Sequence, residues 1–210
     1  TSVINTDVTL DVPASTVQFG TNNSLTAIGQ ALTDGAGAYG LTKTGAGNLT
    51  LGGTHIDGVL TGNAGTLQLN ATNNMLPGGI VLNAGTLLVN AQDGVLGAPS
   101  SPDVIVNGGT IDLRTTSGSR SVGFEVVSNA TLALRNGSNV IFTNENLTIA
   151  ATASAFTLNV NRPSGTTTGR ILTLNGPITT AGPLTFNVSG GNTYTAAIAG
   201  AQASLALGGD

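Results

Sequence analysis

The sequence predicts an all-β protein, a right-handed parallel β-helix of about ten rungs with roughly 20 residues in each. Three observations support this prediction. Short runs in which apolar and polar residues alternate occur along the whole chain, as in half-buried strands. The segment Asn-Ala-Gly-Thr-Leu and its variants recur at a nearly regular interval, which is in the range of solenoid repeats. No segment has the apolar spacing, length and caps of an amphipathic helix.

The first third of the chain contains short runs that we expect to form strands. The glycine-rich segment 34–40 is expected to form a turn, because it has no Lys-Ser/Thr step and no helix follows it, unlike a phosphate-binding loop. The expected strands lie at 3–4, 8–12, 17–19, 25–28 and within 41–53.

The segment 79–90 defines the repeating unit as a short strand, a tight turn at Asn83-Ala84-Gly85 and a second short strand. Asn and Gly tolerate a positive φ, so the chain can turn there at little steric cost. Four apolar side chains alternate along the two strands and are expected to point into the core: Ile80, Leu82, Leu87 and Val89.

Copies of this unit set the expected register. Leu67, Leu87, Ile111 and Leu132 occupy equivalent positions, and the longest step, from Leu87 to Ile111, contains the loop insertion 98–102. Equivalent strands of successive rungs should therefore pair in parallel, and the right hand is the one preferred for parallel crossovers. Six residues are expected to form the turns, with the asparagines stacked as an amide ladder: Asn63, Gly65, Asn83, Gly85, Asn107 and Gly109.

Beyond residue 140 the repeat weakens but the alternation continues. Strands are expected at 140–142, 147–149, 156–160, 171–174, 184–188, 197–199 and 205–209. Tyr39 and Tyr194 are expected to be exposed. The phenylalanines that alternate with aliphatic residues are expected in the core: Phe124, Phe142, Phe156 and Phe186.

We expect residues 1–210 to form one continuous β-solenoid domain, as a segment of a longer chain or fibre. An antiparallel β-sandwich is the alternative fold, because both classes use short alternating strands. The near-identity of the repeats at a single period favours the solenoid.

Composition and charge restrict the partners. The net charge is −4 and the chain has no basic run, so we expect no binding to nucleic acid. No apolar stretch is long enough for a transmembrane helix, so we expect no membrane insertion by this segment. The absence of cysteine excludes disulfides and thiolate metal sites.

The segment 41–53, the Asn-Ala-Gly-Thr-Leu units and Gly190-Gly191-Asn192-Thr193-Tyr194-Thr195 resemble the autotransporter-associated β-strand repeat. The resemblance covers residues 41–134 well and residues 182–209 recognisably. His55-Ile56-Asp57 stands where that repeat has Asn-Thr-Tyr. The resemblance implies a secreted or surface-displayed bacterial β-solenoid that serves as a stalk, filament or adhesin and has no catalytic motif.

Few residues suggest chemistry. His55 and Asp57 lie two apart, which would place them on one face of a strand. Asp103 and Asp112 could lie on adjacent rungs, with Glu125 nearby, as a carboxylate pair of a polysaccharide-cleaving β-helix. Calcium repeats and EF-hand loops are absent. We therefore expect no catalytic residues, no cofactor and no metal site.

The sequence thus predicts a non-enzymatic extracellular structural or adhesive protein, located outside the cell or at the cell surface. The segments 1–11 and 201–209 resemble ordinary strands instead of caps, so we expect end-to-end self-association. A surface glycan or a host or cell-surface ligand, of unknown identity, is the other class of partner that an adhesin would have. The alternative is a carbohydrate-active β-helix, a hydrolase or lyase, which needs carboxylates that converge in one groove.

Overall fold

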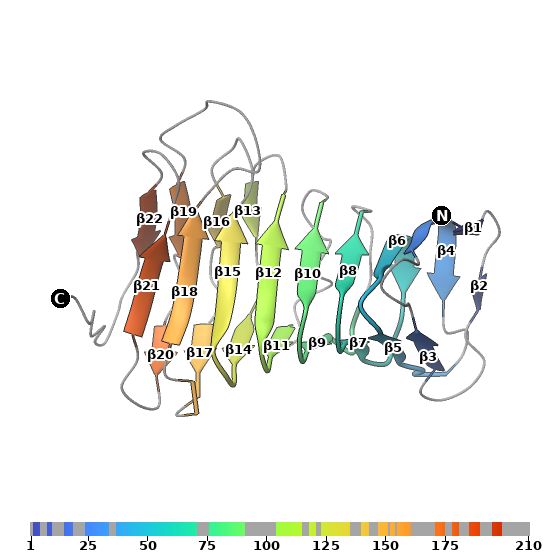
Figure 1. The fold of residues 1–210 in the computed structure, drawn as a ribbon, viewed down its shortest axis with the longest axis horizontal. Coiled ribbons are helices and arrows are strands. Elements are labelled where there is room, and N and C mark those ends of the chain that lie inside the picture. The colour runs from blue at the N-terminus through green and yellow to red at the C-terminus, as the bar shows by residue number, and fades with distance from the viewer. Residues whose placement is uncertain are drawn as a thin grey trace.

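In a computed structural model of the chain, parallel strands stack side by side as a β-solenoid (Figure 1). No helix occurs in the described residues. The structure describes residues 2–4, 8–9, 15–18, 24–33, 37–70, 76–90, 104–114, 118–120, 123–134, 140–142, 147–150, 152–153, 155–160, 171–174, 178–180, 185–189 and 195–198. Side chains are described for residues 33, 37–52, 56–70, 76–90, 104–114, 123–133, 148–150, 152–153 and 155–157.

The longest sheet, sheet 1, contains ten strands and forms one side of the coil. Along the sheet, each strand from β6 to β18 pairs with the strand one rung earlier and the strand one rung later; β21 ends the sheet, and both β1 and β2 pair with β4. Its strands are β1 (Ser2–Ile4), β2 (Val8–Thr9), β4 (Ser24–Thr33), β6 (Asn48–His55), β8 (Thr66–Leu69), β10 (Thr86–Val89), β12 (Gly109–Leu113), β15 (Ala130–Leu134), β18 (Ala155–Val160) and β21 (Thr185–Ser189).

Sheet 2 contains eight shorter strands and forms a second side. In the three successive rungs β7–β8, β9–β10 and β11–β12, a sheet 2 strand leads through a corner directly into a sheet 1 strand. The strands of sheet 2 are β3 (Ser15–Gln18), β5 (Leu41–Thr44), β7 (Leu60–Gly62), β9 (Ile80–Leu82), β11 (Val104–Val106), β14 (Phe124–Val126), β17 (Leu147–Ile149) and β20 (Ile178–Thr180).

Sheet 3 lies toward the C-terminal end of the coil and contains four strands. The strands are β13 (Gly118–Arg120), β16 (Val140–Phe142), β19 (Ile171–Leu174) and β22 (Thr195–Ile198). All the described pairs in the three sheets are parallel, including β13–β16, β16–β19 and β19–β22. The antiparallel sandwich is therefore wrong.

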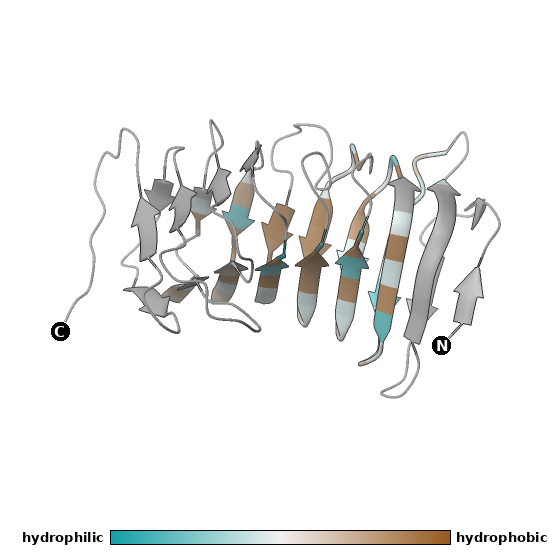
Figure 2. Cartoon of the chain, turned by 90° about the horizontal axis from the view of Figure 1, so that it is seen from above, coloured by the Kyte–Doolittle hydropathy of each residue, from teal (hydrophilic) through white to brown (hydrophobic). Residues whose placement is uncertain are grey.

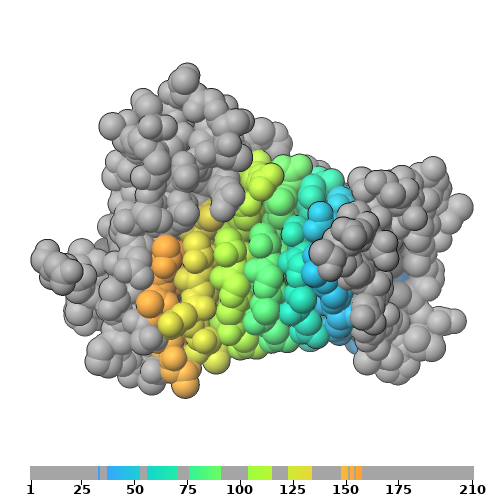
Figure 3. Space-filling view, in the orientation of Figure 1, coloured from blue at the N-terminus to red at the C-terminus, as the bar shows by residue number. Residues whose placement is uncertain are grey.

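The predicted register is confirmed in the central rungs. Leu87 pairs with Leu67 on one side and with Ile111 on the other, and Ile111 pairs with Leu132. These pairs join the positions that the sequence repeats marked as equivalent. Figure 3 shows these rungs as adjacent bands that follow the order of the chain.

Rung length varies more than the sequence predicted. The register partners Leu49 and Leu67 lie closer together along the chain than the partners Leu67 and Leu87. The spacing then grows from Leu132 to Leu158 and again from Leu158 to Val188. Each of these two longest rungs contains a strand of sheet 3 between sheet 1 and sheet 2. A nearly uniform step thus describes only the middle of the chain.

The core consists of aliphatic columns that run along the coil. All four side chains expected to point inward from residues 79–90 are buried, and Figure 2 shows hydrophobic residues along the strands of the central rungs. Because parallel strands lie about 4.8 Å apart, each buried leucine packs on an equivalent residue of the next rung. The inward columns of sheet 1 are Leu49–Leu67–Leu87–Ile111–Leu132 and Leu51–Leu69–Val89–Leu113.

The aromatic predictions are partly confirmed. Phe124 and Phe156 are buried, as expected. Tyr39 is half-buried, so the prediction that its ring is exposed is wrong. The ring lies against Gly37, where a Cβ atom would meet the ring carbon Cζ at 2.3 Å. The side chains of Phe142, Phe186 and Tyr194 lie outside the described residues.

Candidate functional site

Asparagine side chains join successive rungs at the corner between sheet 2 and sheet 1. Nδ2 of Asn83 donates to Oδ1 of Asn63 at 2.7 Å, and Nδ2 of Asn107 donates to Oδ1 of Asn83 at 2.6 Å. The main chain is joined as well, because the N–H of Asn83 donates to the carbonyl of Gly62 at 2.8 Å. The corner therefore forms a hydrogen-bonded column along the coil axis.

Glycine is required at the end of each of these corners. Gly85 has a φ of 83°, and a Cβ atom there would lie 2.3 Å from the carbonyl oxygen of Gly65. Gly65 and Gly109 share both properties. A side chain would thus adopt an unfavourable backbone conformation and also collide with the previous rung.

The asparagine column spans the rungs with the shortest corners. Three residues separate β7 from β8, and three separate β9 from β10. In the preceding rung, Lys43 pairs with Gly62 and Asn48 pairs with Thr66. Four residues, 44–47, lie between Lys43 and Asn48, so this corner is one residue longer. On the other side, Val126 pairs with Val106 but Ala130 pairs with Gly109. The corner after β14 is therefore also one residue longer. A longer corner flanks the asparagine column at each end.

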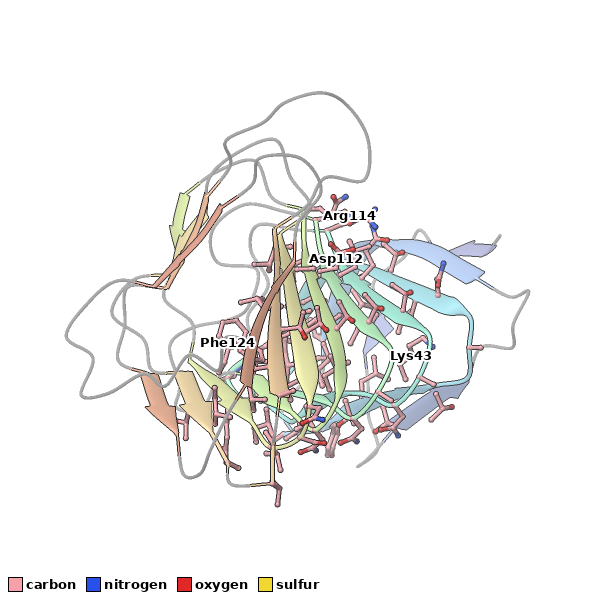
Figure 4. The ribbon with its side chains drawn as sticks, turned by 60° about the vertical axis from the view of Figure 1, so that its left-hand side comes forward. Lys43, Asp112, Arg114 and Phe124 are labelled. Carbon is pink, nitrogen blue, oxygen red and sulfur yellow. The ribbon has the colours of Figure 1, made fainter. Side chains whose placement is uncertain are left out.

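Lys43 lies at the first of these boundaries, with its side chain inside the coil (Figure 4). Its Nζ donates to the carbonyl oxygens of Thr44 at 3.1 Å, Gly45 at 2.6 Å and Ala64 at 2.8 Å. Lys43 is fully buried, and this burial lowers the pKa of the ammonium from its ordinary value of 10.5, because desolvation disfavours the charged form. The ammonium thus links two successive corners.

A second charged group lies at the end of β12 in sheet 1. Oδ2 of Asp112 accepts hydrogen bonds from Nε of Arg114 at 3.1 Å and from Nη2 at 3.0 Å. The Asp112 side chain is 4 % exposed and the Arg114 side chain 37 %. Asp112 pairs with Leu88 and Ala133, which are also buried. Figure 4 shows the pair apart from Lys43 and Phe124.

Among the suspected residues whose side chains the structure describes, none come together as a site. β6 ends at His55, and Asp57 lies beyond it at an exposed bend, so the two do not share one face of a strand. Asp112 is on sheet 1 and Glu125 is on sheet 2. Asp103 and the His55 side chain lie outside the described residues.

The part of the chain that the structure describes holds no cluster of metal-ligating side chains. In those ranges, no three His, Cys, Asp or Glu side chains lie close enough together to hold a metal ion. The same residues include no helix of the length and hydropathy needed to span a bilayer.

Sequence reasoning missed two features of the corners. The first is the inward position of Lys43, which the alternation of Leu41 and Lys43 along one strand could have revealed. The second is a further glycine column on the N-terminal side of the sheet 2 strands. A Cβ atom at Gly58 would lie 2.5 Å from the nitrogen of Gly40, and one at Gly78 would lie 2.4 Å from the carbonyl of Gly58. The recurrence of glycine at these three positions was the available signal.

Comparisons with known proteins give no relative from which to transfer an activity. No protein-family model, no curated protein and no solved structure matches the chain. The corner column is therefore interpreted from its own geometry. The geometry provides stacking contacts between rungs, together with a buried ammonium whose hydrogen bonds go to main-chain oxygens.

Proposed function

We propose that this chain is a structural segment of an extracellular, non-enzymatic stalk, filament or adhesin. Its function is to build length. The coil in this proposal is right-handed, with about ten rungs that would span about 50 Å at about 4.8 Å per rung.

One observation carries the proposal. The residues that recur between rungs are those that hold one rung on the next. Asn63, Asn83 and Asn107 form the amide ladder, and the glycine that ends each corner lets the main chain of one rung approach the previous rung. Recurrence of stacking residues supports a role for the stack itself.

End-to-end association is supported by the sheet edges. β20, β21 and β22 are the last strands of sheets 2, 1 and 3, and among the described strands each pairs along one edge. Because all three run parallel to their neighbours, their edges can accept a further rung by the same pairing. Head-to-tail contacts of this kind form open filaments.

The extracellular location rests on the resemblance of residues 41–134 to the autotransporter-associated repeat. Protease treatment of intact producing cells tests it. We expect antibody-detected protein to be cleaved at the surface or recovered in the medium. Full protection in intact cells, with cleavage after lysis, would contradict the location.

Assembly is tested on the purified chain. Sedimentation velocity over a wide range of concentrations is expected to show growing species, and negative-stain electron microscopy is expected to show rods of one width and variable length. A single monomeric species at high concentration, with slow amide exchange in β20 and β21, would contradict end-to-end stacking while leaving the location untouched.

The non-enzymatic part is tested by incubation with a panel of acidic and neutral polysaccharides. No increase in reducing ends and no unsaturated product is expected, because Asp112 and Glu125 lie on different sheets. Release of either product by the purified chain, and its loss in Glu125→Gln, would establish the carbohydrate-active alternative instead.

A further inference from the structure

The amide ladder at the corner between sheet 2 and sheet 1 ends at Asn107. The main-chain N–H groups of Asn83 and Asn107 each donate to the end of a sheet 2 strand in the previous rung. In the next rung, the N–H of Val127 makes the equivalent bond, to the carbonyl of Val106 at 2.8 Å. Val127 thus occupies the ladder position but has no side-chain amide to extend the column. Among the described residues, Asn83 has ladder bonds on both sides, whereas Asn107 has one, to Asn83.

The residue that follows this last asparagine also differs. Asn63 and Asn83 are each followed by alanine, whereas Asn107 is followed by Gly108. Glycine lacks the Cβ atom that hinders approach of a main-chain nitrogen to the preceding side chain. Among the described residues, a Cβ atom at Gly108 would meet only the carbonyl oxygen of Asn83, at 3.1 Å. The nitrogen of Gly108 is therefore the least hindered of those that follow a ladder asparagine.

The main-chain N–H of Gly108 is not used in the stacking of the rungs. It makes none of the main-chain hydrogen bonds that the described residues form, whereas the equivalent N–H of Ala84 donates to the carbonyl of Gly62 at 3.4 Å. Asn107 is exposed and Gly108 is half-buried, so water and hydroxide can reach both groups. An exposed amide thus lies beside a main-chain nitrogen that is able to attack it.

These two groups can react without an enzyme, and asparagine is among the thermally labile residues. The nitrogen of Gly108 loses its proton to hydroxide and attacks Cγ of Asn107. A C–N bond forms, and the side-chain nitrogen takes up a proton and leaves as ammonia, which gives a five-membered succinimide. Water then opens the ring at either carbonyl and leaves aspartate or isoaspartate. The net reaction converts an amide and water to a carboxylic acid and ammonia, so it needs no oxidant, reductant or cofactor.

The ladder opposes this reaction. Nδ2 of Asn107 donates to Oδ1 of Asn83 at 2.6 Å, which directs the amide toward the previous rung. The attack needs Cγ of Asn107 to approach Gly108, which lies in its own rung. The ladder bond must therefore open first. One bond has to open at Asn107, whereas two have to open at Asn83.

We propose that Asn107 is a site of spontaneous deamidation, at a rate set by its ladder bond to Asn83. A carboxylate at position 107 presents only acceptor oxygens to Oδ1 of Asn83, which is itself an acceptor. It also adds a negative charge to a chain whose net charge is −4, and isoaspartate lengthens the main chain by a methylene group at the corner. The contact between the β9–β10 and β11–β12 rungs thus weakens with age. This inference does not rest on the proposed extracellular role.

Peptide mapping by mass spectrometry measures the reaction in the purified chain, kept folded at mildly alkaline pH. Conversion should be faster at Asn107 than at Asn63 and Asn83, and part of the product should accept a methyl group from isoaspartyl methyltransferase, which recognises isoaspartate. Gly108→Ala should slow conversion at Asn107 to the level of Asn63. Conversion at Asn107 that is no faster than at the other two asparagines would overturn the proposal. This comparison stands even if a variant fails to fold.

A matched pair of variants measures the role of the ladder bond. Asn83→Ala removes the acceptor of the Asn107 amide and should raise the rate at Asn107 about fivefold, as the loss of one hydrogen bond of about 1 kcal/mol predicts. Asn63→Ala removes the other ladder bond of Asn83 and should leave the rate at Asn107 unchanged. No acceleration in Asn83→Ala would refute control by the ladder bond. Equal acceleration in both variants would refute it too, because the rate would then follow overall stability.

Discussion

Substitution of Gly85 by alanine tests whether the corner column is as closely packed as the structure shows. The change introduces a Cβ atom at a φ of 83° and 2.3 Å from the carbonyl oxygen of Gly65. A left-handed alanine costs about 1–2 kcal/mol. The same carbonyl accepts a hydrogen bond from the N–H of Thr86 at 2.8 Å, and its displacement costs about 0.5–1.5 kcal/mol more. The free energy of unfolding should therefore fall by about 2–3 kcal/mol.

The measurement is equilibrium unfolding in urea, with the change read from the midpoint at constant slope. Gly62→Ala is the matched control. Its Cβ atom would meet only the side-chain ends of Leu82 at 3.2 Å and Leu67 at 3.9 Å, so its cost should be about 1 kcal/mol, at the low end for overpacking. If Gly85→Ala cost no more than Gly62→Ala, the close stacking of main chain on main chain at the corner would be refuted.

Four further predictions follow from single features. Asn83→Ala removes both ladder bonds and should cost about 1–2 kcal/mol in urea unfolding, whereas Asn90→Ala, exposed and outside the ladder, should cost less than about 0.5 kcal/mol; equal costs would argue against the ladder. Leu87→Ala should cost about 2–5 kcal/mol by opening a core cavity, against less than about 1 kcal/mol for the half-buried Thr86→Ala. Arg114→Met should cost about 1–3 kcal/mol because Asp112 remains buried, and adding Asp112→Leu should restore most of it; no restoration would show that the cost lies in lost packing of Arg114. Burial lowers the pKa of Lys43 below 10.5, so between the folded pKa and 10.5 the unfolded chain binds more protons than the folded chain. The free energy of unfolding should therefore rise with pH across that window. The rise should be missing in Lys43→Met, and the same rise in both proteins would rule out Lys43 as its source.

The central rungs were predictable because each local signal there agrees with the fold. In residues 79–90 the alternation identifies the inward side chains, and Asn83 and Gly85 identify the corner. Register followed from comparing copies, since Leu67 and Leu87 are embedded in nearly identical sequence. The structure of such a segment can be predicted because strand propensity, hydrophobic pattern and turn chemistry all favour the same fold.

Other features depend on contacts that a strand pattern does not encode. Asp112 lies between two inward residues of β12, so alternation predicts that its side chain faces outward. The side chain is nevertheless buried, and no local sequence signal predicts this burial. The spacing of His55 and Asp57 would place them on one face only if the strand continued, but a strand ends where the corner begins, here with Gly58 packed against Gly40. The inward position of Lys43 does not follow from residue type, because charged residues seldom face a core.

The rungs keep their columns aligned although they differ in length. Leu49, Leu67, Leu87, Ile111 and Leu132 return to one line even though the spacing between successive members is unequal. From β6 to β15 the extra residues are therefore absorbed between strands, whereas the pairing of β4 with β6 shifts register within the strands. A chain built this way can gain or lose peptide at its joins, or an entire rung, without changing the surface of the remaining rungs. The length of the coil and the size of its loops can thus change while the columns of the remaining rungs stay aligned.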